Sequence, residues 1–276
     1  MRTHYVLSLA SFGLPFAAQA TTCEATFAKG GSPLGGLRFN ASLEVPDLTP
    51  PSAIGQMRGI AVSKGYDVLV AEAEDGSMLI EQPRTGKARA FPITVTATTE
   101  GKRGTVVMEA KLRAGMMVSS DAAKAEMCGM LNQLKGGKAG LAAASNGMKA
   151  TGASAPLAMS ALAFSQLISK DTERNAAAVP LRYKGKPFII DGIVDYVIKD
   201  GDEYRVAYKI PHPHEEILRL PNTAPFKTDI MCMMAKGQAA YALQLKPRKS
   251  IKLTGTFDEF SETRRVVWMA NCRPVR

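Results

Sequence analysis

The chain lacks the short motifs that mark serine hydrolases and the common nucleotide-binding proteins. It has no G-x-S-x-G element for a serine nucleophile, no P-loop and no dinucleotide fingerprint. No pair of carboxylates has a spacing that assigns them to acid and base roles. We therefore expect a non-catalytic protein without a cofactor, and we assign no catalytic, cofactor-binding or metal-binding residue. An envelope hydrolase with an unrecognised site stays open as an alternative.

Histidine is scarce, with three in the whole chain. His212 and His214 fall in "PHPHEE", followed by Glu215 and Glu216. Two imidazoles on one side of a strand can bind a divalent metal, but two prolines favour a turn or an extended loop here, and no third ligand is evident. We interpret this segment as a solvated loop.

Soft-metal binding is a second possibility, because the chain has 14 methionines. Met231 and Met233 alternate with Cys232 in a predicted strand. Methionine commonly fills irregular gaps in cores. We therefore predict that these methionines fill the core.

Beyond its first twenty residues the chain has no apolar run of the roughly 20 residues that span a membrane. The start, "MRTHYVLSLASFGLPFAAQA", combines Arg2, a short apolar run and the small residues Ala18 and Ala20. This pattern is typical of a secretory signal peptide over residues 1–20. We expect cleavage after Ala20 and a periplasmic or secreted protein; the threonines before Cys23 do not favour a lipoprotein.

Four cysteines remain after such cleavage, and no two form a CxxC pair that would suggest a metal site. Four cysteines allow three disulfide connectivities. They fall two in each half of the chain, so the economical pairing is Cys23 with Cys128 and Cys232 with Cys272.

Residues 21–135 predict an α+β domain of order αββββα. Thr49 and Pro50 begin a helix that Gly65 ends, and a second helix begins near Ser120. Between them, "YDVLVAEA" with "MLIEQ" and "FPITVTATT" with "TVVMEAKLR" read as two hairpins. Two helices on one face of such a sheet look like the helix-grip-type modules of bacterial envelope proteins, an analogy of fold only.

Residues 136–180 read as a linker, because Gly, Ala and Ser dominate "GGKAGLAAASNGMKATGASAP". Within it, residues 156–170 can form one amphipathic helix. We expect this helix to dock on a neighbouring domain, with a membrane-surface or partner-docking helix as the alternative.

Residues 181–276 predict an all-β domain of five strands, with a short helix or turn between the third and the fourth. That order is the one of an OB-fold barrel. Gly192 and Gly255 suit the sharp bends of such strands.

Residues 186–272 resemble the tRNA_anti-like OB domains of bacterial exported proteins. The matching elements are Gly192-Ile193-Val194, Cys232, Lys236-Gly237-Gln238, Gly255-Thr256-Phe257 and Asn271-Cys272. The resemblance implies a five-stranded OB-like barrel in which the third and fifth strands are neighbours, so that Cys232 can reach Cys272.

Positive charge gathers in this last part, which has 17 Lys and Arg against 11 Asp and Glu. Lys246, Arg248, Lys249 and Lys252 precede and enter the fourth strand. OB folds bind single strands by combining positive grooves with aromatic platforms. The nearby aromatic residues are Tyr196, Tyr204, Tyr208, Phe257 and Trp268.

Tyr204 and Tyr208 share a face with Val206 and Ile210, which favours core packing over base stacking. An exported protein also rarely meets nucleic acid. We therefore expect a periplasmic binding or adaptor protein of the cell envelope, whose basic run contacts a protein or another anionic partner. Binding of single-stranded nucleic acid is the alternative; a solvated strand edge is the plainest interpretation of the basic run.

Overall fold

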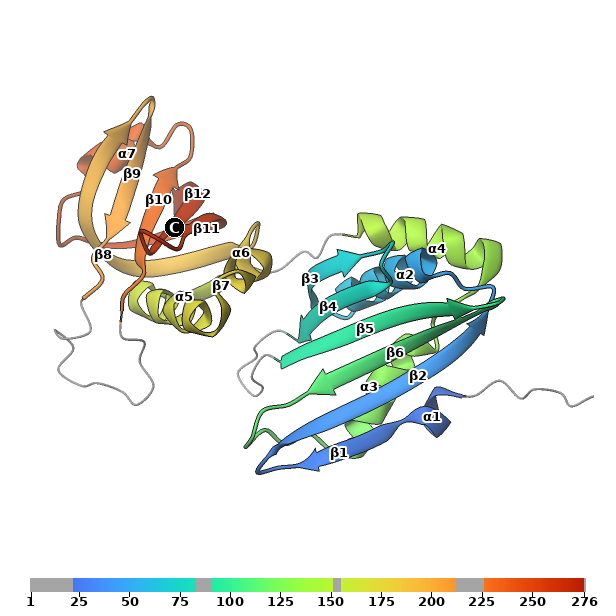
Figure 1. Ribbon diagram of the computed structural model, residues 1–276. Helices are drawn as coiled ribbons and strands as arrows, with labels where there is room; N and C mark the ends of the chain where they lie inside the picture. The colour runs from blue at the N-terminus through green and yellow to red at the C-terminus, as the bar shows by residue number, and fades with distance from the viewer. Residues whose placement is uncertain (1–21, 83–90, 151–154, 212–225, 276) are drawn as a thin grey trace, which may run out of the picture.

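The computed structural model describes residues 22–82, 91–150, 155–211 and 226–275 (Figure 1). The fold is mixed α/β, with two six-stranded sheets. The expected signal peptide and the "PHPHEE" segment lie outside the described residues. Among the described helices, none is long and apolar enough to cross a membrane. We call residues 22–150 the first unit and residues 155–275 the second unit.

The sheet of the first unit is antiparallel, in the order β1-β2-β6-β5-β4-β3. Its side chains alternate between a buried and an open face; in β5, for example, Ile93, Val95 and Ala97 are buried. The strands are β1 (Ala28–Ser32), β2 (Gly36–Pro46), β3 (Asp67–Glu72), β4 (Ser77–Gln82), β5 (Phe91–Glu100) and β6 (Arg103–Lys111). The sequence predicted only the last four, so the expected αββββα order is incomplete.

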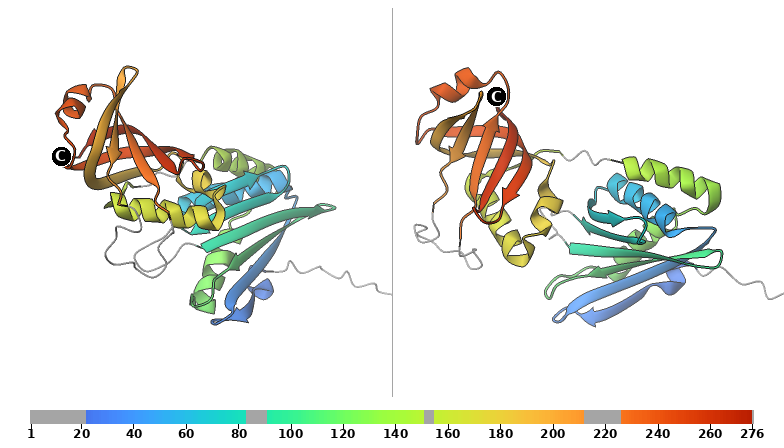
Figure 2. Two further views of the ribbon diagram at one scale, coloured as in Figure 1. Left: turned by 60° about the vertical axis from the view of Figure 1, so that its left-hand side comes forward. Right: turned by 45° about the horizontal axis from the view of Figure 1, so that its top comes forward.

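Helices cover one face of this sheet (Figures 1 and 2). They are α1 (Cys23–Thr26), α2 (Pro50–Ser63), α3 (Ser120–Leu131) and α4 (Gly137–Lys149). The two long helices that the sequence predicted are α2 and α3. The hydroxyl of Ser119 accepts a hydrogen bond from the Ala122 amide and so caps α3. A disulfide between Cys23 and Cys128 ties α1 to α3.

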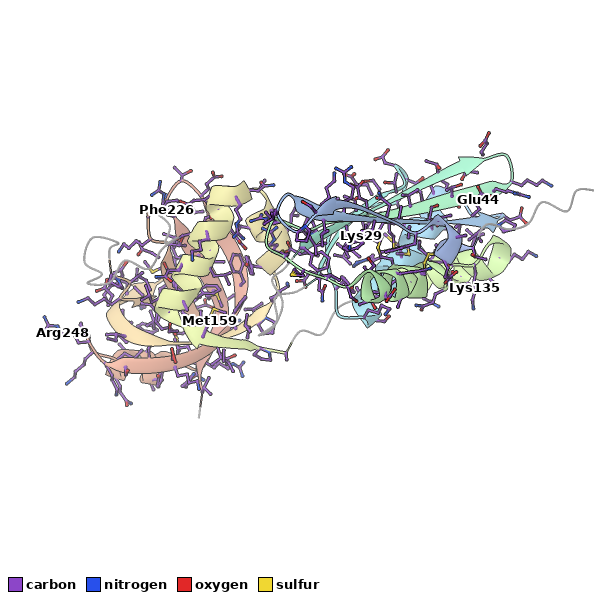
Figure 3. All side chains as sticks on the ribbon, turned by 90° about the horizontal axis from the view of Figure 1, so that it is seen from below. Lys29, Glu44, Lys135, Met159, Phe226 and Arg248 are labelled. Atoms are coloured by element: carbon purple, nitrogen blue, oxygen red, sulfur yellow. A yellow bond between two sulfur atoms is a disulfide. The ribbon has the colours of Figure 1, made fainter. Side chains whose placement is uncertain are left out.

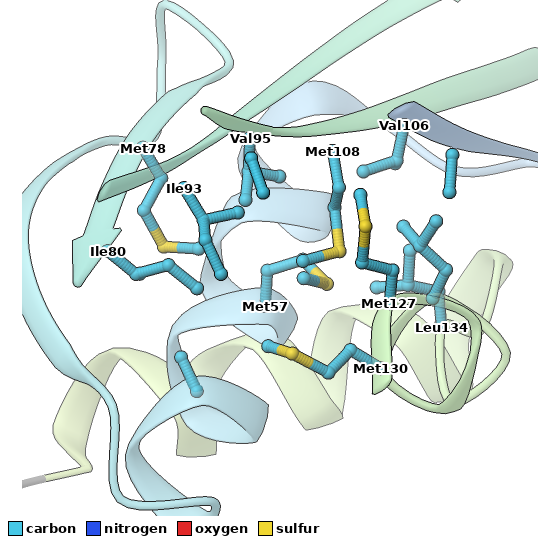
Figure 4. Packing of buried hydrophobic residues seen from close by; sticks show 14 of the residues in the cluster. Met57, Met78, Ile80, Ile93, Val95, Val106, Met108, Met127, Met130 and Leu134 are labelled. Atoms are coloured by element: carbon cyan, nitrogen blue, oxygen red, sulfur yellow. The ribbon is translucent and has the colours of Figure 1, made fainter. Parts of the chain in front are cut away.

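Methionine fills much of the core between the sheet and the helices. Figure 4 shows Met57 of α2, Met108 of β6 and Met130 of α3 gathered there, and all three are fully buried. The flexible thioether side chain adapts to the irregular space between helices and a twisted sheet.

Helix α4 corrects the expectation of a linker, because residues 137–149 are helical. The small residues of α4 let its backbone approach α2 closely. A Cβ atom added at Gly147 would lie 1.9 Å from the Gly55 carbonyl oxygen, and one at Gly59 would lie 2.8 Å from the Gly147 Cα. Glycine and alanine are therefore the packing surface of this helix pair.

The second unit contains the other sheet. Its strands are β7 (Leu157–Ser160), β8 (Pro187–Asp200), β9 (Glu203–Tyr208), β10 (Asp229–Met234), β11 (Ser250–Ser261) and β12 (Val266–Pro274). The pairings run β8-β9-β10-β12-β11 and return to β8, so five strands form a closed ring (Figure 2). The β10–β12 pairing is parallel and the other pairings in the ring are antiparallel.

A strand and three helices complete the second unit: β7, which pairs in parallel with β8, α5 (Ala161–Asn175), α6 (Ala178–Tyr183) and α7 (Ala239–Gln244). The helix expected over 156–170 begins only at Ala161, because Leu157–Ser160 extend along β8 and the Ser160 hydroxyl caps α5. Phe164 and Ile168 of α5 are fully buried in the core of the ring. Helix α5 therefore packs on the ring of strands as part of the second unit, where the sequence predicted a linker that contained a docked helix.

Within the described residues, two ion pairs join the units. Arg182 of α6 lies 2.7 Å from a carboxylate oxygen of Glu81 on β4, and Lys186 lies 2.6 Å from Asp67 on β3. Asp67 and Glu81 are register partners in the first sheet, so both acidic groups come from one edge of that sheet.

Candidate functional site

A disulfide joins two strands of the ring, and two glycines allow close packing inside it. Cys232 on β10 and Cys272 on β12 form the disulfide, in the pairing expected from the sequence. A Cβ atom at Gly255 would lie 2.7 Å from the Cys272 sulfur, and one at Gly192 would lie 2.8 Å from both Ala161 and the Tyr208 ring. These glycines are needed for close approach, in addition to the bends that the sequence suggested.

Five aromatic side chains were candidates for base stacking in the sequence, and three of them point into the ring of strands. Tyr208 is 2% exposed and donates a hydrogen bond to the Ile190 carbonyl, 3.1 Å away. Phe257 is fully buried, and Tyr204 packs against the same core. The prediction that Tyr204 and Tyr208 serve core packing is therefore confirmed.

The other two, Tyr196 and Trp268, point outward from the ring of strands. Tyr196 on β8, Ala207 on β9, Met231 on β10 and Trp268 on β12 are successive register partners, so they form one row across four strands. The next row holds Ile198, Arg205 and Met233. We call the following residues the outer face: Tyr196, Ile198, Arg205, Met231, Met233 and Trp268.

The position of the methionines corrects an expectation. Ile230, Cys232 and Met234 point inward and are buried, whereas Met231 and Met233 are half-exposed on the outer side. The alternation along β10 was predicted correctly, but of the three methionines in this strand only Met234 fills the core.

Contacts within the outer face hold its side chains in place. The Arg205 guanidinium stacks on the Trp268 ring, 4.6 Å from its centroid, and also forms an ion pair with Asp200. The Tyr196 hydroxyl lies 4.0 Å from the Met231 sulfur. Tyr196 and Ile198 are 40% and 42% exposed, so this apolar surface is open to a ligand.

Carboxylates surround the outer face. Glu259 of β11 is the register partner of Trp268. Asp229 begins β10 and is paired with Lys227, 3.1 Å away. The turn between β8 and β9 adds Asp200 and Asp202. Asp200 and Asp229 are already paired, whereas Glu259 forms no ion pair among the described residues, so a polyanion at the Trp268 ring would meet this carboxylate.

The basic run predicted from the sequence lies elsewhere on the ring of strands, where β11 begins. Lys246, Arg248, Lys249 and Lys252 are all exposed. The first three occupy the turn between α7 and β11, which we call the basic turn (residues 246–249). Within the described part of the chain, no ion pair involves any of these four side chains.

Sequence reasoning missed Arg205 as a site residue. The signal that was present is its position between Tyr204 and Val206, because a residue flanked by inward side chains in a strand faces outward. Among the described residues, no group of three or more His, Cys, Asp or Glu side chains is placed to hold a metal ion.

No family model matches this chain, and no curated protein matches it. Several solved structures are similar at low identity. A lipoprotein from Klebsiella pneumoniae subsp. pneumoniae, described as a candidate nucleic acid-binding protein, is 14% identical over 44% of this chain and 92% of that chain, with a TM-score of 0.32.

Fission yeast Pot1 with single-stranded DNA is 10% identical over 90% of this chain and 79% of that chain, with a TM-score of 0.25. The di-domain ARO/CYC protein BexL from the BE-7585A biosynthetic pathway is 9% identical over 80% of each chain, with a TM-score of 0.23. Likeness at these TM-scores decides neither the fold nor the function of this chain.

Proposed function

We propose that this chain is a non-catalytic binding or adaptor protein of the cell envelope that holds a protein partner on its outer face. The observation that carries the proposal is the row of Tyr196, Met231 and Trp268 on the solvent side of the second sheet. These residue types, together with arginine, are enriched where proteins meet one another.

The order of the strands supports an OB-like barrel. A ring of five strands, with a short helix between the third and the fourth, matches the Greek-key order of that fold. The first unit, with helices on one face of an antiparallel sheet, supports the helix-grip-like assignment. Such folds host many functions, so the proposal depends on the surface chemistry.

The charges near the outer face favour a protein over a nucleic acid. A phosphate backbone gains affinity from cations and loses it beside carboxylates. Arg205 is the cation of the outer face, and it is already paired with Asp200. Glu259 opposite Trp268 would repel a phosphate at the stacking position.

Two disulfides support export. Disulfides persist in the periplasm and outside the cell and are rare in the cytosol. The pairs Cys23–Cys128 and Cys232–Cys272 leave none of the four cysteines unpaired. Together with the expected signal peptide, they support a periplasmic or secreted protein.

Crosslinking in intact cells tests the proposal. A photoreactive amino acid replaces Tyr196 or Met233 on the outer face, and Thr96 on the open face of the first sheet is the matched control. We expect one protein partner to be crosslinked from both outer-face positions and not from Thr96. Crosslinking from all three positions alike would contradict a site on the outer face.

Binding of single-stranded nucleic acid is the second candidate. The exposed Tyr196 ring lies on β8 two residues from Val194, whose backbone is hydrogen-bonded to the basic turn, so an aromatic ring and cations lie on neighbouring parts of the surface. Titration of a labelled oligothymidylate at low salt separates the two. Tight binding that Trp268→Ala abolishes and that falls steeply with salt would favour this candidate.

A further inference from the structure

The basic turn is fixed to the barrel by its backbone. The Arg248 amide donates a hydrogen bond to the Val194 carbonyl, and the Val194 amide donates one to the Lys249 carbonyl, both at 2.9 Å. The Lys249 amide also donates to the Lys246 carbonyl, at 3.1 Å. The cations of this turn are therefore presented from a defined backbone.

Arg248 has a backbone conformation that is unfavourable for its side chain. Its φ is +68°, in the left-handed region where a Cβ atom crowds the following carbonyl oxygen. Glycine would take this conformation without that crowding. The strain alone does not identify a site, because Arg265 has a φ of +52° as well; the cations around Arg248 are the distinguishing feature.

More cations lie around the turn. Lys252 follows on β11, and its carbonyl accepts a hydrogen bond from the Val275 amide of the chain end. Arg273 on β12 is the register partner of Thr254. The Lys209 amide donates to the Ile193 carbonyl on β8. These three side chains are exposed, as are those of the turn.

An apolar side chain lies among these cations. Ile193 is 44% exposed and is the register partner of Ser250, which directly follows the turn. The acidic side chains nearby are Asp191, the register partner of Lys252, and Asp195. The patch therefore combines six cations and two carboxylates around one exposed isoleucine.

We infer that this patch binds an acidic segment of a protein partner, with carboxylates at Lys246, Arg248 and Lys249 and an apolar side chain on Ile193. Complementary charge favours such a segment and speeds its association. Ser250 and Lys209, which lie opposite Ile193, offer no aromatic ring for stacking a base. An exposed isoleucine suits an apolar side chain better than a phosphate.

The position of the patch agrees with a contact surface. Figure 3 places Arg248 at the end of the second unit that is farthest from the first unit. The patch is separate from the outer face, so this inference goes beyond the proposed function and can fail or succeed independently of it.

The experiment compares two exposed arginines that both have a left-handed backbone conformation, Arg248 and Arg265. Arg265, in the turn between β11 and β12, is also exposed and has a φ of +52°. Arg248→Gly and Arg265→Gly therefore change the net charge equally, and both replace a left-handed arginine. The full chain with its disulfides intact is titrated into a fluorescent twelve-residue peptide of glutamates, glycines and one central leucine.

We expect Arg248→Gly to weaken binding of this peptide about fivefold or more, and Arg265→Gly to change it less than about twofold. The melting temperature of Arg248→Gly should not fall, because glycine relieves the backbone strain. Ile193→Ser should weaken the peptide with leucine more than one with serine in its place. Thr96→Ala, on the open face of the first sheet, should leave binding unchanged.

Three results would overturn the inference. The first is equal weakening by the two glycine variants, which would show attraction to net charge alone. The second is no binding of the peptide by the native chain at low salt. The third is a loss on Arg248→Gly that appears only with an oligothymidylate or with vesicles of anionic lipid, which would assign the patch to nucleic acid or to a membrane.

Discussion

Arg182 of α6 donates two hydrogen bonds to the carboxylate of Glu81 on β4, from Nε at 2.7 Å and from Nη2 at 3.0 Å. Both side chains are largely buried, 20% and 7% exposed. Burial lowers the pKa of Arg182, but the bonds to Glu81 and the charge of Asp171 raise it more, so the guanidinium stays charged. This pair lies where the two units meet.

Arg182→Ala should destabilise the protein by about 3 kcal/mol, because removal of one partner leaves the other charge buried and unpaired. Urea denaturation of the full chain measures the change. Arg103→Ala is the control, since the ion pair of Arg103 with Glu44 is exposed and is worth about 0–1 kcal/mol. Equal losses in the two variants would show that the Glu81 pair is no stronger than a surface pair.

Gly147→Ala should destabilise the protein by about 1–3 kcal/mol, because the new Cβ atom would collide with the Gly55 carbonyl and push α4 away from α2. Gly129→Ala in α3 is the control: no atom lies within 4 Å of its added Cβ. Alanine is the better helix former, so this second variant should gain about 0.5–1 kcal/mol. Thermal denaturation shows whether each variant is more or less stable than the native chain. A Gly147→Ala variant that is more stable would contradict the close packing of α4 on α2.

Loss of the Cys232–Cys272 disulfide should destabilise the second unit by about 4 kcal/mol on the chain-entropy model, for a sequence separation of 40 residues. The double variant Cys232→Ala with Cys272→Ala, melted beside the native chain, measures the loss. Gly255→Ala should also lower the melting temperature while the disulfide is present, since its Cβ would lie 2.7 Å from the Cys272 sulfur. Mass spectrometry of non-reduced peptides checks the pairing itself.

Stability should fall above about pH 10, because buried tyrosines resist ionisation in the folded state. Burial raises the pKa of Tyr66, Tyr183 and Tyr208, and the nearby charges of Glu126 and Asp171 raise the first two further. Tyrosines of the unfolded chain ionise near pH 10. The contribution of these residues is thus fully present below that pH and is lost as the pH rises above it.

The melting temperature, measured from pH 8 to pH 11, tests this expectation of alkaline instability. Tyr66→Phe should flatten the fall with pH. A flat stability profile across this range in the native chain would contradict it.

Local signals in the sequence were sufficient for much of the first unit. Helix α2 has Pro50 in its first turn and Gly65 just past its end, and α3 has a serine cap. Strand β2 was missed although "GLRFNASLEVP" alternates, with Leu37, Phe39 and Ala41 buried. Strand β1, "AKGGS", has no apolar alternation and gains its structure by pairing with β2.

Tertiary contacts decided the features that the sequence did not reveal. Helix α4 has the composition of a linker, and only its approach to α2 through Gly147 makes small residues favourable there. In β10, alternation separates Met231 and Met233 from Cys232 but does not say which set faces inward. The outer face was therefore recognisable only once the five strands were seen to close.

The backbone on either side of Lys186 bonds to the ring of strands, and the Lys186 side chain takes part in the contact between the units. The Gly185 amide donates to the Phe257 carbonyl and the Phe257 amide donates to the Lys186 carbonyl, 2.8 and 2.9 Å away. A mechanical pull between the first unit and a partner on the barrel would thus load β8 and β11 lengthwise, across the whole row of bonds between them. The ring of strands would thus resist such a pull with all of these bonds at once.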